Sequence, residues 1–304
     1  MVDSEPKALD ASAAPVLVTG GNRGIGLATC HALARRGIPV LMATRDVARG
    51  ETAASALRAA LPGAKIDVLA LDLGSQAGIR RTADKLIAEG PVPRALVNNA
   101  GAIGLGETIT FTEDGFETAF GVNHLGHFAL TLLLLPMLLT HAPVRVISVS
   151  SIRHMKGAAG PGARFDFDNL KGEKGYAPRM AYNNTKLANV WFAYGLHRRY
   201  ASQGVLSIAA CPGFVPETLG ATRSGLSRFI YNRALRLIPG SRPARVSGEE
   251  LAALAVDPRF ETEGGTFWAS GKRIPSSPES YDVALADRLW ALSERLTGVT
   301  VPTA

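Results

Sequence analysis

The sequence predicts an α/β fold, a doubly wound parallel sheet in a single domain. Two observations carry this prediction: short β-branched runs alternate with longer helical patterns, and a cluster of glycines separates the first run from the first helical pattern. Of the 304 residues, 46% are hydrophobic and 19% are charged, which excludes an intrinsically disordered chain. We expect one domain over residues 15–298, after a flexible tail over residues 1–14.

Seven strands are expected, each a short aliphatic run of the kind that parallel sheets bury on both faces. In order, they are Val16–Thr19, Val40–Thr44, Ile66–Leu71, Ala95–Val97, Val144–Ser148, Leu206–Ala210 and Gly265–Trp268. Longer helical patterns separate them, as the crossovers between parallel strands require. These patterns lie near residues 24–36, 47–60, 76–89, 123–140, 181–203 and 281–296.

The fourth helical pattern contains the most apolar stretch of the chain, Phe128–Leu139. With 12 residues it is much shorter than the roughly 20 that a membrane span requires. We therefore expect a buried helix and no membrane association. The N-terminus shows no apolar signal segment, and Cys30 and Cys211 suggest neither a disulfide framework nor a zinc site. A cytoplasmic protein without a metal site is expected.

Two long connections interrupt the alternation, residues 153–179 and 212–248. Both leave from the carboxyl ends of strands, where open parallel sheets bind their ligands, so we interpret both as walls of a substrate site. Between Thr218 and Gly248 the chain has six arginines and no Asp or Glu. Three interpretations of this basic stretch remain open: a substrate lid, a site for an acidic partner, and a membrane-surface helix. No nucleic-acid-binding module accompanies it, so no nucleic-acid partner is expected.

The turn after the first strand is typical of dinucleotide binding. Its glycines let the backbone approach a pyrophosphate, whose charge then lies at a helix N-terminus. The spacing is G-x-x-x-G-x-G, and its position between a strand and a helix strengthens a motif that is weak by itself. The residues of this turn that we expect to hold the cofactor are Gly20, Asn22, Arg23, Gly24, Ile25 and Gly26.

The end of the second strand indicates which dinucleotide binds. An NAD site usually has an acidic residue there, which holds the ribose 2′-hydroxyl. This chain has Thr44 at that position, followed by Arg45. Because Arg45 and Arg23 suit a 2′-phosphate, NADP(H) is the expected cofactor. The alternative is that Asp46 takes the acidic role one residue later and that Arg45 is only solvated.

Tyr182 and Lys186 begin a long helical pattern, and their spacing of four residues lets both side chains face one pocket. A free phenol has a pKa of about 10, and a neighbouring cation lowers that pKa toward the range in which proton transfer is efficient. No other tyrosine of this chain has a lysine four positions later. We expect this pair to perform acid–base chemistry.

The order of these and further motifs resembles the short-chain dehydrogenases/reductases, from Pro15 to about Trp268. The motifs are the glycine turn over 19–26, Asp72-Leu73, Asn98-Asn99-Ala100-Gly101, Asn123, Ser150-Ser151, Tyr182-x-x-x-Lys186 and Pro212-Gly213. The resemblance implies a Rossmann-type domain with seven parallel strands. It also implies hydride transfer between a nicotinamide and a carbonyl or alcohol carbon.

The resemblance further implies a role for each matched position. Tyr182 would be the general acid or base, and Lys186 would lower its pKa and hold the nicotinamide ribose. Ser151 would hold the substrate oxygen, and Asn123 would anchor a water molecule. Outside the glycine turn, the cofactor would contact Arg45, Asp72, Leu73, Asn99, Ala100, Gly101, Tyr182, Lys186, Pro212, Gly213, Val215 and Thr218.

One departure from the classical pattern bears on the substrate, because Ser151 and Tyr182 lie 31 residues apart. The longer gap, with the run Phe165–Leu170 inside it, resembles the retinol dehydrogenase and protochlorophyllide reductase branch, which implies a bulky lipophilic substrate. The expected activity is NADPH-dependent reduction of a lipophilic ketone, aldehyde or quinone, or the reverse oxidation. The alternatives are a redox-sensing regulator that binds NADP(H) without turnover and an NAD(P)-dependent epimerase or dehydratase. A homodimer or homotetramer is compatible with the family pattern.

Overall fold

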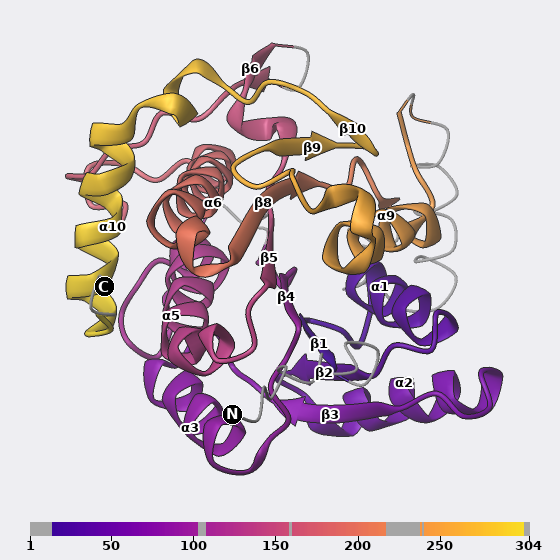
Figure 1. Cartoon of the computed structure of the whole chain (residues 1–304). Coiled ribbons are helices and arrows are strands. Elements are labelled where there is room, and N and C mark those ends of the chain that lie inside the picture. Colours follow the sequence, from indigo (N-terminus) through magenta and orange to yellow (C-terminus); the bar gives the residue numbers. More distant parts are fainter. Residues whose placement is uncertain (1–13, 103–107, 158–159, 217–237, 239, 301–304) are drawn as a thin grey trace, which may run out of the picture.

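The computed structural model describes residues 14–102, 108–157, 160–216, 238 and 240–300. At its centre is an eight-stranded sheet with the strand order β10-β9-β8-β5-β4-β1-β2-β3 (Figure 1). Seven of the strands are parallel, as predicted, and β10 pairs with β9 in the antiparallel direction. The predicted seven-stranded sheet is therefore short by one edge strand, because the two residues of β10 carry no periodic pattern.

The strand bounds agree closely with the expected aliphatic runs. They are β1 Val16–Thr19, β2 Val40–Thr44, β3 Ile66–Ala70, β4 Ala95–Asn98, β5 Val144–Val149, β8 Val205–Cys211, β9 Phe267–Ala269 and β10 Lys272–Arg273. All residues of β1, β2 and β4 are buried, as expected of strands that are covered on both faces. A separate short hairpin consists of β6 (Lys156–Gly157) and β7 (Gly160–Pro161).

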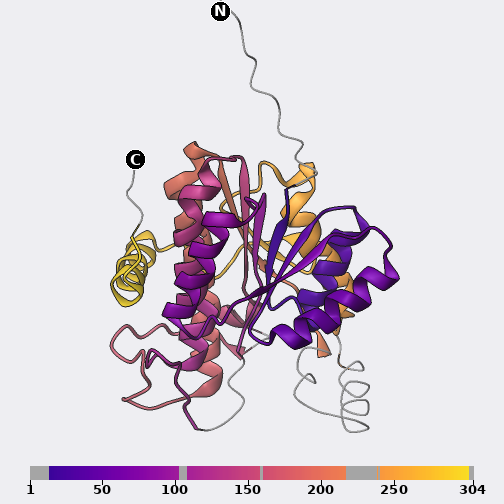
Figure 2. The same cartoon turned by 90° about the horizontal axis from the view of Figure 1, so that it is seen from below.

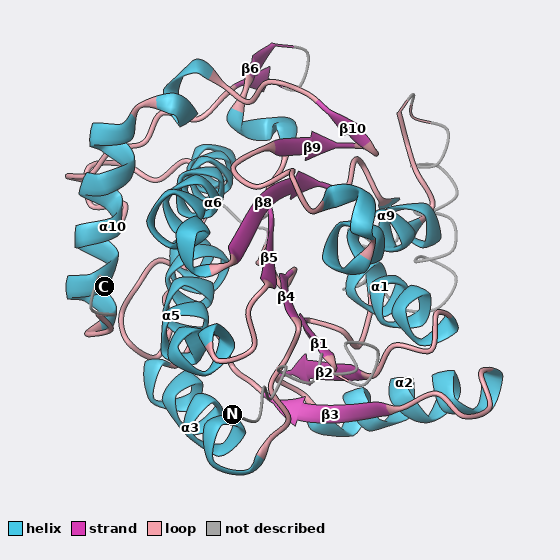
Figure 3. Ribbon diagram, viewed as in Figure 1, coloured by secondary structure: helices cyan, strands magenta, loops and turns pink. Residues whose placement is uncertain are grey.

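Helices cover both faces of the sheet (Figures 2 and 3). One layer contains α1 (Gly24–Arg35), α2 (Val47–Ala60) and α9 (Ala244–Val256), and the other contains α3 (Gln76–Glu89), α5 (Gly126–Leu139) and α6 (Pro178–Tyr200). The last helix, α10 (Val283–Thr297), packs outside α6. Helix α9 was not predicted, and its first turn lies inside the expected loop 212–248.

The apolar helix after β4 is longer than its most apolar stretch. The short helix α4 (Thr118–Phe120), a π-helical turn over Gly121–Leu125 and α5 form one continuous helix. By length and composition this helix is apolar enough to cross a membrane. The mean hydropathy of its most apolar 18 residues is 1.6, but 72% of that segment is buried inside the protein. The same properties describe a helix that packs in the centre of a fold, so the prediction of a buried helix is confirmed.

The insertion over 153–179 packs mainly on α6. Rings of Phe165 and Phe167 lie 5.4 and 6.4 Å from the ring of Trp191 in that helix. The Asn183 side chain donates a hydrogen bond to the carbonyl oxygen of Gly162 at 2.9 Å, which ties the insertion to α6 from a second side. The middle of the insertion therefore extends the apolar core instead of forming a substrate wall.

Candidate active site

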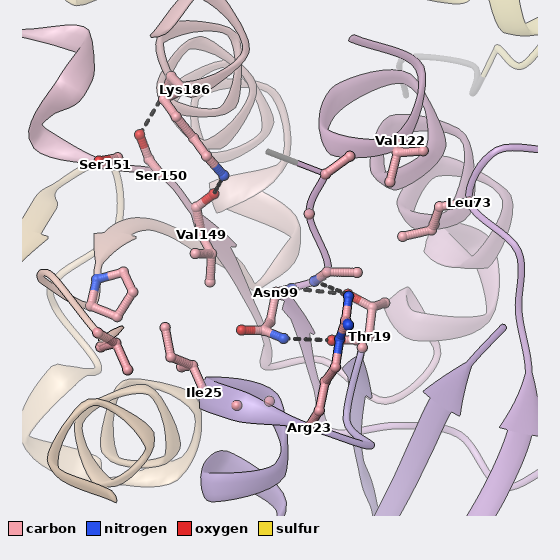
Figure 4. A pocket seen from close by; sticks show the side chains of 18 of the residues that line it. Thr19, Arg23, Ile25, Leu73, Asn99, Val122, Val149, Ser150, Ser151 and Lys186 are labelled. Carbon is pink, nitrogen blue, oxygen red and sulfur yellow. Dashed lines mark hydrogen bonds between the residues drawn. The ribbon is translucent and has the colours of Figure 1, made fainter. Parts of the chain in front are cut away.

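A cleft of about 1590 Å³ opens at the carboxyl ends of the parallel strands, where ligands bind in this fold class. It is larger than the roughly 300–1000 Å³ of common ligand pockets, so it has room for a dinucleotide together with a substrate. Most of the predicted site residues line it: Gly20, Asn22, Arg23, Gly24, Ile25, Gly26, Arg45, Asp72, Leu73, Asn99, Ala100, Gly101, Ser151, Tyr182, Lys186, Pro212, Gly213 and Val215 (Figure 4). Asn123 is buried behind this lining, and Thr218 lies outside the described residues.

The glycine turn forms a backbone cradle that side chains would fill. Gly20 and Gly24 have φ angles of +64° and +55°, which L-residues rarely adopt. A Cβ atom on Gly26 would lie 2.2 Å from the carbonyl oxygen of Gly20. Arg23 precedes α1 without a side-chain hydrogen bond to that helix, and the first turn of α1 has no acidic residue. The turn therefore fits the pyrophosphate of a dinucleotide, which would accept hydrogen bonds from the first amides of α1.

A buried network joins the ends of β1 and β4 below this cradle (Figure 4). The Thr19 hydroxyl accepts hydrogen bonds from the amides of Asn99 and Ala100, both at 2.9 Å, and the Asn99 side chain donates to the carbonyl oxygen of Thr19 at 2.8 Å. Because two amides occupy its lone pairs, the Thr19 hydroxyl donates its proton to Nε2 of His127, 2.8 Å away. Nδ1 of His127 then carries the ring proton and donates to the carbonyl oxygen of Asn123 at 3.1 Å.

His127 therefore connects its own helix, which also contains Asn123, with the end of β1. Because Nε2 accepts a proton in this network, the imidazole ring must be neutral. Burial lowers the pKa of His127 to about 4, which keeps the ring neutral at physiological pH. No role was predicted for this histidine from the sequence, because a histidine on an apolar helix is usually an ordinary core residue.

After the end of β2, a threonine and an arginine come before the first acidic side chain. Thr44 is buried there, and Arg45 lines the cleft. Asp46 begins α2, where its carboxylate accepts a hydrogen bond from the amide of Arg49 at 3.1 Å and pairs with the Arg49 guanidinium at 3.0 Å. Arg49, which the sequence analysis missed, also lines the cleft. Asp46 is therefore already engaged by its own helix, while three arginines, Arg23, Arg45 and Arg49, face this end of the cleft.

Ser151 and Tyr182 meet at the opposite end of the cleft. The Ser151 side chain is hydrogen-bonded to the Tyr182 phenol, although 31 residues separate them in the sequence. Burial raises the pKa of Tyr182 to about 12, and the Ser151 hydrogen bond and the charge of Arg153 oppose this rise. The charge of Cys211 adds to the rise, and Lys186 is not among the groups that shift the phenol pKa, so the expected lowering by Lys186 is not seen.

Lys186 is held below the phenol by the end of β5. Its Nζ lies 5.3 Å from the centre of the Tyr182 ring and donates to the carbonyl oxygen of Val149 at 3.1 Å (Figure 4). The side chain of Asn189 donates to the same carbonyl at 2.9 Å, and Ser150 Oγ donates to the carbonyl oxygen of Lys186 at 2.7 Å. Burial lowers the pKa of Lys186 to about 8, so the ammonium form still predominates at neutral pH.

Asn123 lies in the π-helical turn and holds the loop after β4. Its side chain accepts a hydrogen bond from the amide of Ala102 at 2.6 Å and donates to the carbonyl oxygen of the same residue at 2.9 Å. It also donates to Thr185 Oγ1 at 3.2 Å, which ties this loop to the helix of Tyr182 and Lys186. In this structure Asn123 positions the residues around the cleft and does not line it.

The ends of the two insertions contribute the remaining wall. From the described part of 153–179, only Arg153 and Arg179 line the cleft. From 212–248, the lining residues are Pro212, Gly213, Phe214, Val215 and Ile238, whereas most of the basic stretch lies outside the described residues. Cys211, at the end of β8, also lines the cleft and was not predicted, because an isolated cysteine gives no signal in a sequence.

Comparisons with known proteins agree with this geometry. Residues 14–163 match the family model described as short chain dehydrogenase. Retinol dehydrogenase 12 of Mus musculus is 38% identical over 284 residues, which cover 93% of this chain and 86% of that protein. Retinol dehydrogenase 13 of Homo sapiens is 38% identical over 294 residues, with coverages of 95% and 86%. A solved structure, the RhlG/NADP active-site complex of Pseudomonas aeruginosa, has a TM-score of 0.66 at 23% identity, covers 84% of this chain and 94% of its own, and is alike in fold.

Proposed function

The chain belongs to the short-chain dehydrogenases/reductases, in their retinol dehydrogenase-like branch, and from this we propose that it is an NADPH-dependent carbonyl reductase for lipophilic substrates. The same site would oxidise the corresponding alcohols. The observation that carries the proposal is the meeting of Ser151, Tyr182 and Lys186 at one end of a cleft whose other end is the glycine cradle.

The protonation states of the site suit carbonyl reduction. A bound nicotinamide supplies the hydride that reaches the carbonyl carbon. Tyr182 is protonated at neutral pH, since its pKa is about 12, and gives its proton to the carbonyl oxygen as negative charge develops there. The Ser151 hydroxyl donates a hydrogen bond to the same oxygen. Lys186, a cation below a pH of about 8, then stabilises the phenolate that Tyr182 becomes.

Two arginines and a paired carboxylate support NADP(H) over NAD(H). Arg23 and Arg45 can bind a 2′-phosphate through charge-assisted hydrogen bonds, while Asp46 and Arg49 pair with each other. We expect Arg45→Asp to shift the ratio of the kcat/KM values from NADPH toward NADH by about tenfold or more. Arg81→Asp, the same charge change at an exposed position of α3, is the control. An unchanged ratio in Arg45→Asp would mean that Arg45 does not contact the phosphate.

Apolar side chains on the cleft wall support a lipophilic substrate. Ile152 and Ile238 are 42% and 45% exposed while lining the cleft, and Phe214 lies on the same wall. Large apolar side chains that stay exposed in a concave wall mark a binding surface for apolar ligands. The similar proteins named retinol dehydrogenases are consistent with such substrates.

The decisive test follows NADPH consumption with a panel of lipophilic aldehydes, ketones and quinones. Tyr182→Phe removes the proton donor and keeps the ring, so turnover should be lost while the Kd for NADPH stays nearly unchanged. Retained turnover in Tyr182→Phe would refute its role as the acid. A wild-type protein that binds NADPH and reduces none of these compounds would instead support the redox-sensing regulator.

A further inference from the structure

The catalytic end of the cleft carries two arginines that the proposed reaction does not use. Arg153 lies in the 3-10 turn Ile152–His154, two residues after Ser151, and Arg179 lies in the first turn of α6, three residues before Tyr182. Both line the cleft. The side chains of Ser151 and Tyr182 are hydrogen-bonded, so each arginine is close in sequence to one member of this pair. Residues three apart on a helix share a face, so Arg179 projects from the same side of α6 as Tyr182.

Charge around the cleft is distributed unevenly between its ends. The described lining residues include two acids, Asp46 and Asp72, which follow β2 and β3 at the far end. Asp46 begins α2, and Asp72 accepts a hydrogen bond from the amide of Gly74 at 2.9 Å. At the catalytic end the described lining has cations and no carboxylate. An anionic group that entered there would meet only attractive charges among these residues.

Helix stability does not explain Arg179. A cation in the first turn of a helix is unfavourable because the N-terminus carries partial positive charge, and α6 has no acidic residue in its first turn and no side-chain cap. Arg179 forms no ion pair with a described residue. Arg153 lines the cleft, and its charge opposes the rise of the Tyr182 pKa. Exposed Ile152, which precedes Arg153 in the sequence, adds an apolar side chain to the same lining.

We propose that Arg153 and Arg179 form a subsite for a carboxylate on the substrate, so that the enzyme acts on lipophilic carbonyl compounds that also carry an acid group. The inference rests on the proposed function and adds a substrate class to it. Guanidinium groups bind carboxylates through paired, charge-assisted hydrogen bonds, which ester groups cannot replace.

The test compares a medium-chain fatty acid that ends in an aldehyde with its methyl ester. In both cases the aldehyde carbon takes up hydride, its oxygen takes up a proton, and NADPH becomes NADP+. We expect wild type to prefer the acid about tenfold in kcat/KM, with the preference falling as salt screens the charges. Arg179→Gln should reduce kcat/KM for the acid severalfold and leave that for the ester unchanged. Arg153→Gln should reduce the ratio of the acid kcat/KM to the ester kcat/KM severalfold, and this ratio is the readout because the charge of Arg153 also acts on the Tyr182 phenol in both reactions. Arg81→Gln is the control for a lost surface charge.

A binding measurement separates failure of this inference from failure of the proposed function. Calorimetry in the presence of NADPH compares a saturated fatty acid of the same length with its methyl ester, neither of which is reduced. Acid binding that Arg179→Gln weakens would support the subsite even if no aldehyde is turned over. Equal handling of acid and ester in both assays, or a preference that survives both arginine substitutions, would overturn the subsite while leaving any observed reductase activity intact.

Discussion

At the scale of single residues, the site depends on groups that hold one another in defined protonation states. The short spacing of Tyr182 and Lys186 in the sequence predicted that they share a pocket, because a helix places such residues on one face. The sign of the Tyr182 pKa shift was not predictable in this way. It depends on the burial of the phenol in the folded chain, which is the largest influence on its pKa.

His127 offers a test of the link between the end of β1 and the π-helical turn that contains Asn123. His127→Phe should remove the ring nitrogen that accepts the proton of the Thr19 hydroxyl and the ring N–H that donates to the Asn123 carbonyl oxygen, which costs about 2 kcal/mol of unfolding free energy. NADPH should bind about tenfold more weakly, because Thr19 also holds the amides of Asn99 and Ala100. Urea unfolding and NADPH titration measure the two effects.

The exposed His141 provides the matched control, since His141→Phe should change neither quantity appreciably. If His127→Phe were destabilised but bound NADPH as tightly as wild type, the histidine would serve packing alone.

At the scale of the elements, the glycine turn is the part that tolerates least change. The Cβ atom of Gly26→Ala would lie 2.2 Å from the Gly20 carbonyl oxygen and 2.6 Å from Asn99 Nδ2. The turn must move to relieve this overlap, so we expect about 1–3 kcal/mol of destabilisation and at least a tenfold loss of NADPH affinity. Thermal unfolding and fluorescence titration would measure both.

Gly78→Ala in α3 is the control, since its nearest contacts, with Ser75, lie at 3.3 Å. Alanine favours helices over glycine, so this variant should be near neutral or slightly stabilised. A Gly26→Ala variant that behaves like Gly78→Ala would show that the turn is more adaptable than its geometry indicates.

Elements with a local pattern were predicted, and elements that depend on distant partners were not. Strands β1 to β5, β8 and β9 follow from short aliphatic runs, and the glycine turn follows from its glycine spacing, whereas the two-residue strands β6, β7 and β10 show no such run. Helix α9 has consecutive buried residues over Leu251–Ala255, so no helical period is visible. The apolar packing in the middle of the insertion over 153–179 was not predicted, because Phe165 and Phe167 find their partner, Trp191, only in the folded chain.

At the scale of the whole molecule, two buried histidines make the unfolding free energy depend on pH in the acidic range. Burial lowers the pKa of His124 to about 3 and that of His127 to about 4, from an ordinary value of 6.5. The unfolded chain therefore binds more protons than the folded one below pH 6.5, so the unfolding free energy should fall by several kcal/mol as the pH drops from 6.5 to about 4.

Urea unfolding at a series of pH values checks this prediction, and His127→Gln should show a shallower slope than wild type over the same range. Equal slopes for the two proteins would mean that His127 is protonated in the fold without penalty.

The strand order also has a consequence for biosynthesis. Strand β1 lies between β2 and β4, and the amides that donate to the Thr19 hydroxyl follow β4. The glycine turn and the strands around it are therefore encoded within about the first third of the polypeptide. Tyr182, Lys186 and the Pro212-Gly213 turn leave the ribosome much later. Because chains fold progressively as they emerge, the nascent protein would be able to bind the adenosine half of a dinucleotide well before the residues that use its hydride have been synthesised.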